Sequence, residues 1–339
     1  MRVLQVMASG LHGGAELFYE DLVPALTKAG VDQAGVIRPY PDRAAKLEAA
    51  GVRVTMLRFG GPLDVLTRLR LNRIAKTERP DIAMGWMNRA CRDLPKGPWV
   101  NVGRLGGYYD LKYYRRCSQL ICNTLHIADY VVREGRKADA VHYIPNFCPV
   151  RDEAPVDREA LGGAGAKVLL ILARLHPAKG IDVALRALSD IKDAVLWIAG
   201  DGPEESRLKR LAADLQLGSR ARFLGWRDDR SALLKAADVC LLPSRHEPFG
   251  NVVLGAWSHG VPLVAAASQG PGYLVRHGED GLLTPVDDPA ALAAAVNTVL
   301  QDAALARRLA AGGHQRTAAE FSEAAVVARY LAVYQAILG

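Results

Sequence analysis

Short apolar segments alternate with longer amphipathic segments along the chain. The first apolar segment predicts a strand at 2–7, and the amphipathic segment after it predicts a helix that ends near Gly30, because glycine commonly follows the last helical residue. This alternation of strand and helix predicts a parallel sheet with right-handed crossovers. The further strands expected in this half are 33–37, 52–57, 81–84, 99–103, 119–123 and 140–144, with helices at 42–50 and 63–77.

The pattern restarts after a segment typical of a hinge and linker. Prolines bound residues 145–149, and glycines dominate residues 162–165. Expected strands then follow at 167–173, 194–199, 221–223, 239–242, 262–265 and 282–284. The sequence therefore predicts two doubly wound α/β domains that face a cleft, over residues 1–150 and 165–320. A last helix at about 322–339 has apolar residues at helical spacing, which predicts that it crosses back to the first domain.

Composition supports two domains and a cytoplasmic protein. The chain has 339 residues, half of them hydrophobic, and single domains rarely grow beyond about 250–300 residues. Its five cysteines form no C-x-x-C pair, which predicts free thiols in a reducing compartment and makes a zinc site improbable. The first eight residues are too short for a signal peptide, and no apolar run reaches about 18 residues. The net charge of +7 favours an acidic partner.

Two expected strand ends carry the strongest candidate chemistry. Arg174 and Lys179 follow the strand at 167–173, and Glu247 follows the strand at 239–242. Ligands of parallel sheets bind beyond the carboxyl ends of the strands, where helix N-termini suit phosphate. The fork of Arg174 and the point charge of Lys179 suit two phosphates, and Glu247 can accept hydrogen bonds from sugar hydroxyls. Phe249, Gly250 and Asn251 can turn backbone N–H groups toward the ligand.

These residues predict a nucleotide-sugar site. The alternatives are that Lys179 is a solvated residue of a helix-starting turn and that Glu247 only stabilises a helix dipole.

Gly13 and Gly14 predict a second place where backbone can approach a phosphate or a sugar. The alternative is a simple turn. Residues 10–14 lack the G-x-G-x-x-G spacing of a dinucleotide site, and no acidic residue ends the second strand, so an oxidoreductase is disfavoured.

An ordered series of motifs resembles the retaining GT-B glycosyltransferases of family 4. The motifs are Gly13-Gly14-Ala15-Glu16, Ala173-Arg174-Leu175-His176-Pro177-Ala178-Lys179-Gly180, Ile198-Ala199-Gly200-Asp201-Gly202-Pro203, Glu247-Pro248-Phe249-Gly250 and Asp280-Gly281-Leu282-Leu283. The resemblance implies two Rossmann-like domains, an acceptor bound mainly by the first and a nucleotide-sugar donor bound mainly by the second. It also implies retention at the anomeric carbon, no metal and no other cofactor.

The resemblance assigns roles to particular residues. It implies that Arg174 and Lys179 contact the diphosphate and that Glu247 is the first of a pair of glutamates. The second glutamate of the family contacts the nucleotide ribose, but this chain has Gly255 there, which leaves the nucleotide preference open. Gly225, Trp226 and Arg227 stand where the family holds the nucleobase, although a tryptophan at a strand end is also commonly packed in a core.

The acceptor residues are predicted from the first half of the chain. The segment 104–114 resembles bacterial members that build lipopolysaccharide or other surface glycans, so Arg104, Tyr108 and Tyr109 are candidates. Some members carry an acceptor-side histidine after a middle strand, which this chain lacks. His12 is a further candidate, with a solvated turn residue as its alternative.

A basic amphipathic segment suggests an anionic membrane surface as a partner. Each Lys or Arg near such a surface contributes about 1 kcal/mol, although a solvated helix face over a core has the same pattern. Only 6% of residues are aromatic and no stacking platform interleaves the cations, so nucleic acid is not an expected partner. The cations are Arg58, Arg68, Arg70, Arg73, Lys76, Arg79, Lys112, Arg115 and Arg116, and the apolar positions are Leu63, Val65, Leu66, Leu69, Leu71 and Ile74.

The sequence thus predicts a retaining, metal-independent glycosyltransferase that moves a sugar from a nucleotide-sugar to a glycan or lipid-linked acceptor. The alternatives are a GT-B sugar-nucleotide epimerase, which needs acids or bases around the sugar from both domains, and a non-catalytic GT-B subunit, which the glycine at 255 favours.

Overall fold

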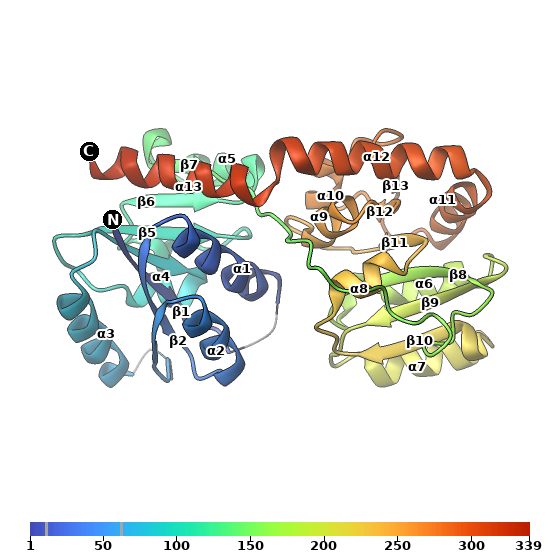
Figure 1. Ribbon diagram of the computed structural model, residues 1–339, viewed down its shortest axis with the longest axis horizontal. Helices are drawn as coiled ribbons and strands as arrows, with labels where there is room; N and C mark the ends of the chain where they lie inside the picture. The colour runs from blue at the N-terminus through green and yellow to red at the C-terminus, as the bar shows by residue number, and fades with distance from the viewer. Residues whose placement is uncertain (11–12, 62–63) are drawn as a thin grey trace. The chain divides into compact units, whose positions relative to one another are not determined.

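The computed structural model describes residues 1–10, 13–61 and 64–339. These residues form two compact α/β units (Figure 1). Unit 1 contains residues 1–147 and 323–339, and unit 2 contains residues 148–322. The chain therefore starts and ends in unit 1.

Unit 1 is built on a parallel sheet with the strand order β3-β2-β1-β4-β5-β6-β7. Its strands are β1 (Arg2–Met7), β2 (Asp32–Ile37), β3 (Arg53–Met56), β4 (Ile82–Trp86), β5 (Val100–Leu105), β6 (Gln119–Cys122) and β7 (Val141–Tyr143). Its helices are α1 (Gly14–Lys28), α2 (Pro41–Ala49), α3 (Val65–Glu78), α4 (Met87–Asp93), α5 (Leu125–Arg133) and α13 (Glu323–Leu338), with short 3-10 turns at Leu111–Tyr114 and Ala138–Ala140.

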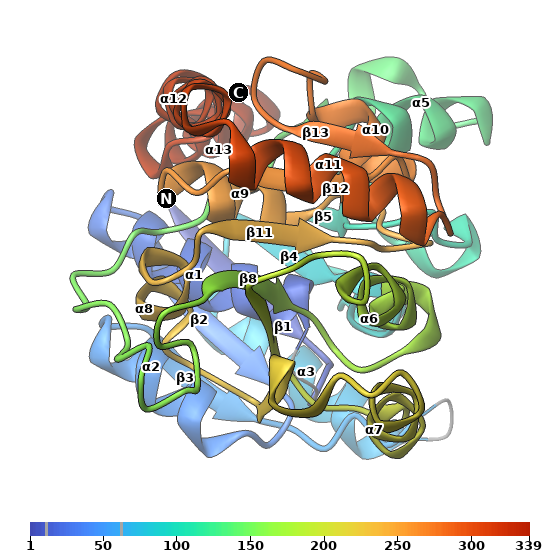
Figure 2. The same cartoon turned by 90° about the vertical axis from the view of Figure 1, so that its right-hand side faces the viewer.

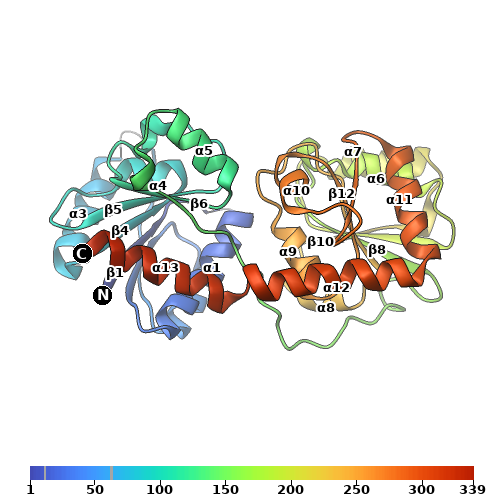
Figure 3. The same ribbon diagram turned by 90° about the horizontal axis from the view of Figure 1, so that it is seen from above.

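Alternating strand residues give unit 1 two hydrophobic layers. Val3 and Met7 point to the face covered by α1, α2 and α13, whereas Leu4 and Val6 point to the face covered by α3, α4 and α5. Side chains of successive strand residues point to opposite faces, so a central strand covered on both sides must be apolar almost throughout. Figure 3 shows α13 lying across unit 1.

Unit 2 is built on a second parallel sheet, with the order β10-β9-β8-β11-β12-β13. Its strands are β8 (Lys167–Leu172), β9 (Ala194–Ala199), β10 (Ala221–Gly225), β11 (Val239–Leu242), β12 (Leu263–Ala266) and β13 (Leu282–Thr284). Its helices are α6 (Ile181–Leu188), α7 (Glu205–Asp214), α8 (Arg230–Lys235), α9 (Asn251–Ser258), α10 (Gln269–Leu274), α11 (Pro289–Gln301) and α12 (Ala303–Glu320), with 3-10 turns at Pro177–Lys179 and Gly218–Arg220.

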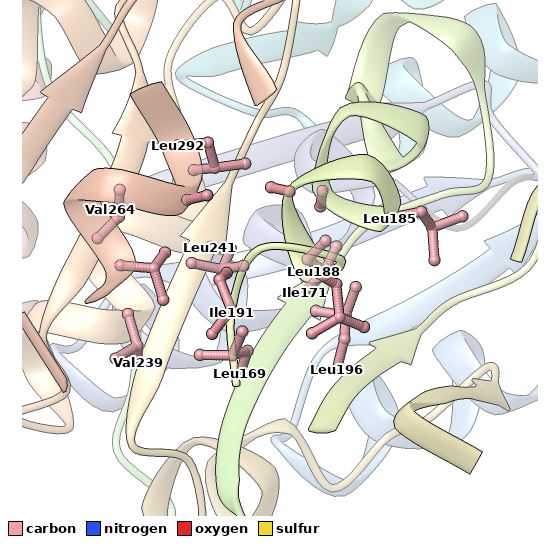
Figure 4. Close-up of a cluster of buried hydrophobic side chains, with 14 of the residues drawn as sticks. Leu169, Ile171, Leu185, Leu188, Ile191, Leu196, Val239, Leu241, Val264 and Leu292 are labelled. Carbon is pink, nitrogen blue, oxygen red and sulfur yellow. The ribbon is translucent and has the colours of Figure 1, made fainter. Parts of the chain in front are cut away.

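Helices cover both faces of the second sheet as well. Figure 2 shows α6 on one side of its strands and α8 on the other. On the α6 side, Leu169 and Leu241 of the central strands meet Leu185 and Leu188 of the helix (Figure 4). On the α8 side, Leu170 and Cys240 pack with side chains of α8 and α9. These two layers fix the carboxyl ends of β8 and β11 side by side.

The predicted fold class is confirmed, including the C-terminal helix. Strands predicted at 2–7, 194–199, 239–242 and 282–284 have the observed bounds, and most others differ by one or two residues. The sequence did not predict α4 and α5. The helix expected at 63–77 is observed as Val65–Glu78, and Leu63 lies outside the described residues.

Within the described residues, the stretch Ala303–Leu338 is long and apolar enough, by length and composition alone, to cross a membrane. Residues 321–322 divide this stretch into α12 and α13. Tyr330 and Tyr334 are buried in the core of unit 1, and Leu309 is buried in the core of unit 2. Each of the two helices therefore packs one stripe of side chains against the core of a unit.

Candidate functional site

The loops after β8 and β11 leave the second sheet at a point where the strand order reverses. β8 lies between β9 and β11. After β8 the chain adds β9 and β10 on one side of it, and then β11, β12 and β13 on the other side. Parallel α/β sheets bind ligands at such a switch point, beyond the carboxyl ends of the strands. Residues 173–180 form the first loop and residues 243–250 the second. The sheet thus brings together the segments that carry Arg174, Lys179 and Glu247.

Lys179 and Glu247 form an ion pair across these two loops. Nζ of Lys179 lies 2.6 Å from Oε2 of Glu247, and the side chains are only 18% and 16% exposed. The backbone N–H of His246 also donates to the carbonyl oxygen of Ala178, at 3.1 Å. Two groups that the sequence predicted separately, one for phosphate and one for sugar, are therefore in direct contact.

Gly180 allows the two loops to approach this closely. Its φ is +61°, and a Cβ at this position would lie 2.0 Å from the carbonyl oxygen of Pro243. Any larger residue would push the loop after β8 away from the loop after β11.

Arg245 ties the same loops together and was missed by sequence reasoning. Its Nη1 and Nη2 donate to the two carboxylate oxygens of Asp182, both at 2.8 Å, and Nη1 also donates to the carbonyl oxygen of Pro177 at 2.8 Å. Its Nε lies 2.5 Å from Oδ1 of Asp287. The hydrogen bonds to Asp182 raise the pKa of Arg245. Burial acts to raise the pKa of Asp182, but the hydrogen bonds and charge of Arg245 outweigh it and lower that pKa.

Arg174 is exposed at the end of β8. Among the described residues, its guanidinium makes no hydrogen bond or ion pair, so it is available to a ligand. The loop beneath it is held by the N–H of Leu175, which donates to the carbonyl oxygen of Asp201 at 2.7 Å. Gly200 has φ +149°, and a Cβ there would lie 2.0 Å from the carbonyl oxygen of Ala173. The glycine therefore lets the loop after β9 support the loop that carries Arg174.

The start of α9 presents backbone rather than an aromatic ring. Gly250 precedes the helix with φ +101°, and Asn251 is its first residue. The first N–H groups of a helix lack helical partners and suit an anion. The side chain of Phe249 is buried in the core of unit 2, which leaves its backbone, the part predicted to face the donor, for a ligand contact, and that contact stays a prediction. The N–H of Gly270 donates to the carbonyl oxygen of Glu247 at 2.7 Å, which fixes the peptide that carries the carboxylate.

The residues predicted to hold a nucleobase lie at the end of β10. Gly225 has φ +66°, and its carbonyl oxygen accepts from the N–H of Gly200 at 2.7 Å. Nε1 of Trp226 donates to Oδ1 of Asp228 at 3.1 Å. Nε and Nη2 of Arg227 donate to the two carboxylate oxygens of Asp229. These hydrogen bonds lower the pKa of Asp229. Nε and Nη2 of Arg227 are therefore engaged by Asp229, and base binding stays a prediction.

In unit 1 the corresponding switch point lies between β1 and β4. Gly13 precedes α1 and Gly14 is its first residue. A Cβ on Gly13 would lie 2.7 Å from Oε2 of Glu16, so the glycine leaves room for that carboxylate. His12 lies outside the described residues.

Arg104 is not an open acceptor contact. The side chain is buried, with Nε donating to the hydroxyl of Tyr330 at 2.9 Å and Nη2 donating to Oδ1 of Asn146. The guanidinium also lies over the rings of Phe18 and Trp86, 4.7 and 4.8 Å from their centroids. We therefore correct its predicted role: Arg104 joins β5 to α13 inside unit 1.

The two predicted acceptor tyrosines differ in exposure. Tyr108 is 39% exposed, and its ring lies 5.4 Å from that of Tyr130. Tyr109 is partly buried and stacks on Tyr114 with centroids 6.4 Å apart, and burial raises its pKa. Tyr108 is therefore the better placed of the two to meet a ligand.

Gly255 lies in α9, at the position where the resemblance implies a second glutamate. It is buried, and a Cβ there would lie 3.4 Å from Cδ1 of Leu234 and 3.8 Å from Sγ of Cys148, which are ordinary contacts. The helix backbone is thus not pressed against a neighbour at this position. A longer side chain from this Cβ starts beside apolar atoms.

The described residues contain no group of three or more His, Cys, Asp or Glu side chains placed to hold a metal ion. All five cysteines are free thiols.

Comparisons with known proteins identify the class. The family model for glycosyl transferases group 1 matches residues 166–302. The lipopolysaccharide core biosynthesis glycosyltransferase LpsE of Rhizobium meliloti (strain 1021) is 37% identical over 327 residues, which cover 95% of this chain and 96% of that protein. LpsD of the same organism is 35% identical over 335 residues, which cover 96% of both.

Solved structures show the same fold. HepE of Anabaena, in a complex with UDP-glucose, superimposes with a TM-score of 0.86 at 23% identity and covers 98% of this chain. WaaG, described as a glycosyltransferase involved in lipopolysaccharide biosynthesis, superimposes with a TM-score of 0.75 at 15% identity. The two-sheet fold is therefore that of the GT-B glycosyltransferases. The chain belongs to the group 1 glycosyltransferase family, and it is a glycosyltransferase.

Proposed function

We propose that this protein transfers a sugar from a nucleotide-sugar to a glycan or lipid-linked acceptor during bacterial lipopolysaccharide or surface-polysaccharide synthesis. The observation that carries the proposal is the Lys179–Glu247 ion pair at the β8–β11 switch point, beside the exposed Arg174. The extended similarity to LpsE and LpsD supports the kind of product. HepE, solved with UDP-glucose, supports a nucleotide-sugar donor.

In this proposal the chain's own cations stabilise the leaving group. When the glycosidic bond of the donor breaks, negative charge develops on the nucleoside diphosphate, and preorganised positive groups lower the barrier. Arg174, Lys179 and the first N–H groups of α9 supply that charge, so the transfer needs no metal. Glu247 exchanges its contact with Lys179 for the hydroxyls of the donor sugar and holds the sugar in the reactive orientation. The new bond forms on the face from which the diphosphate leaves, so the anomeric configuration is retained.

The lipid-linked acceptor is proposed from one face of α3. Val65, Leu66 and Leu69 are 57%, 69% and 59% exposed, and the exposed cations Arg70, Arg73 and Lys76 follow on the same helix. We call these six residues the α3 patch. Exposed apolar side chains beside cations are typical of surfaces that lie on anionic membranes. The proposed location is the inner face of the cytoplasmic membrane.

The proposal is tested by supplying candidate donors to the purified protein. Calorimetric titration with UDP, GDP and ADP and with their glucose derivatives should show binding without divalent metal and unchanged binding in EDTA. The anomeric configuration of the transferred sugar, read by NMR with an extract of lipid-linked glycans as acceptor, should match that of the donor. Binding that needs a divalent metal would contradict the metal-independent mechanism, and an inverted product would contradict retention.

A further inference from the structure

Arg245 contacts two residues that lie on either side of Lys179 in the sequence. Arg245 binds Pro177, which lies two residues before Lys179, and Asp182, which lies three residues after it. Arg245 itself stands two residues before Glu247. One guanidinium therefore holds the segment that carries the cation against the segment that carries the carboxylate, and its Nε adds the loop after β13 through Asp287.

We propose that Arg245 is the positioning residue of the donor site: it sets the distance and orientation between Lys179 and Glu247. This inference rests on the proposed function, because it assigns a role within the same donor site. Nε and both Nη atoms of Arg245 already contact Asp182, Pro177 and Asp287, so we assign it a role through the loops rather than a contact with the donor.

The geometry requires an arginine. The planar fork makes two parallel hydrogen bonds to Asp182 while Nε still reaches Asp287, and these directions are fixed by the guanidinium plane. A lysine carries the same charge at a single nitrogen and cannot hold the two carboxylates and the Pro177 carbonyl in one arrangement. Replacing Arg245 with lysine therefore keeps the charge and removes the alignment.

The expected defect lies in turnover more than in binding. Diphosphate affinity is carried by Arg174, Lys179 and the start of α9, which tolerate small shifts because charge attraction is not strongly directional. The reactive orientation is less tolerant, since a misplacement of about 1 Å can lower a rate by roughly a hundredfold.

The test compares Arg245→Lys with wild type in the slow release of nucleoside diphosphate from the best-bound nucleotide-glucose in water. We expect kcat to fall by about tenfold or more while KM for the donor changes by less than about threefold, the pattern of a lost transition-state alignment. Asp182→Asn should lower kcat similarly. The double variant should be no worse than the poorer single variant, because the two residues act as one unit.

Arg220→Lys is the matched control. Arg220 is also a half-buried arginine of unit 2, and its Nη1 donates to the carbonyl oxygens of Leu188 and Ile191, at the other end of α6 from Asp182. Arg220→Lys should lower the thermal midpoint by about as much as Arg245→Lys does. It should leave kcat within about twofold of wild type, because Arg220 is distant from Lys179 and Glu247 and does not align them. Equal kcat in Arg245→Lys and wild type, or an equal loss in Arg220→Lys, would overturn the positioning role. A wild-type protein that binds none of the nucleotide sugars would overturn the proposed function itself, and this inference with it.

Discussion

At the scale of single residues, the proposed donor site has one diphosphate-binding cation that is already paired, Lys179, and one that is open, Arg174. Lys179 is neutralised by Glu247, whereas Arg174 has no charged partner among the described residues. A ligand therefore meets Arg174 first and must compete with a carboxylate for Lys179. The two cations have different consequences when they are removed.

We expect Arg174→Ala to weaken nucleoside-diphosphate binding by roughly 1.5–3 kcal/mol, the range for a hydrogen bond to a charged group, without lowering the thermal midpoint. Lys179→Ala should weaken binding as well and should also lower the midpoint, because Glu247 then loses its partner. Calorimetry and thermal unfolding measure both effects. Unchanged nucleotide affinity in both variants would contradict the assignment of the diphosphate site.

Glu247→Gln separates the sugar contact from the phosphate contact. The amide keeps the size of the side chain but releases Lys179 from its ion pair. Turnover should therefore fall strongly, while affinity for the bare nucleoside diphosphate stays equal or rises. Steady-state kinetics and calorimetry give the comparison, and an equal loss in both quantities would place Glu247 in nucleotide binding or folding.

Residue roles were predictable only where local sequence determines them. Lys179 and Glu247 follow strands with strongly apolar patterns, so their place beyond the carboxyl ends of these strands could be deduced. Arg104 directly follows the strand expected at 99–103, but it lies within β5, and its burial depends on Tyr330, which is 226 positions away. The role of Arg245 depends on Asp182, 63 positions earlier, and no local pattern signals that pairing.

At the scale of elements, the packing of α9 shows how much space surrounds Gly255, which stands where the resemblance implies a second glutamate. Gly255 has space for a methyl group, with the nearest atom 3.4 Å from an added Cβ, but that space is bounded by Leu234 and Cys148. Glycine within a helix is about 1 kcal/mol less favourable than alanine. The position therefore carries a helix-weakening residue that close packing does not require.

Gly255→Ala should raise the free energy of unfolding by about 0.5–1 kcal/mol without changing nucleotide affinity. Gly255→Glu should lower stability relative to the alanine variant, because the longer side chain leaves Cβ beside apolar atoms, and it should not tighten ribonucleotide binding. Urea unfolding and calorimetry on the two variants give the comparison. Tighter binding of a ribonucleotide by Gly255→Glu would show that the site accepts the lost ribose contact.

The buried strands were the most predictable elements, because strands covered on both faces are nearly uniform in their apolar character. β1, β9 and β11 were found with their full bounds. α4 was missed because only seven residues of mixed polarity form it, and the first of them, Met87, has a positive φ. A helix this short and of mixed polarity leaves no periodic pattern in the sequence.

At the scale of the whole molecule, the α3 patch predicts how the protein finds a lipid-linked substrate. Arg68 is less suited to lipid than its neighbours, because its Nε already lies 3.1 Å from the buried carboxylate of Asp93. All six members of the α3 patch are exposed, and Leu66, Leu69, Arg70 and Arg73 are the ones chosen to represent its apolar and basic parts.

Association with vesicles should require anionic lipid and should weaken as salt shortens the Debye length to below about 8–10 Å. The double variant Arg70→Ser/Arg73→Ser should reduce binding, and adding Leu66→Ser should reduce it further. Arg307→Ser/Arg308→Ser, an equal change of charge on exposed residues of α12, serves as the control. Vesicle sedimentation measures the binding. Equal losses in both double variants would show that binding depends on net charge and not on the α3 patch.

The return of α13 to unit 1 sets an order for biosynthesis. The core of unit 1 includes Val326, Tyr330 and Tyr334, and the buried guanidinium of Arg104 can donate to the hydroxyl of Tyr330 only when these last residues are present. Unit 2 lies wholly within residues 148–322, so a ribosome releases all of it before the residues that complete unit 1. The half of the protein that begins first is thus completed last, and a chain that stops before residue 323 leaves Arg104 without its hydroxyl partner.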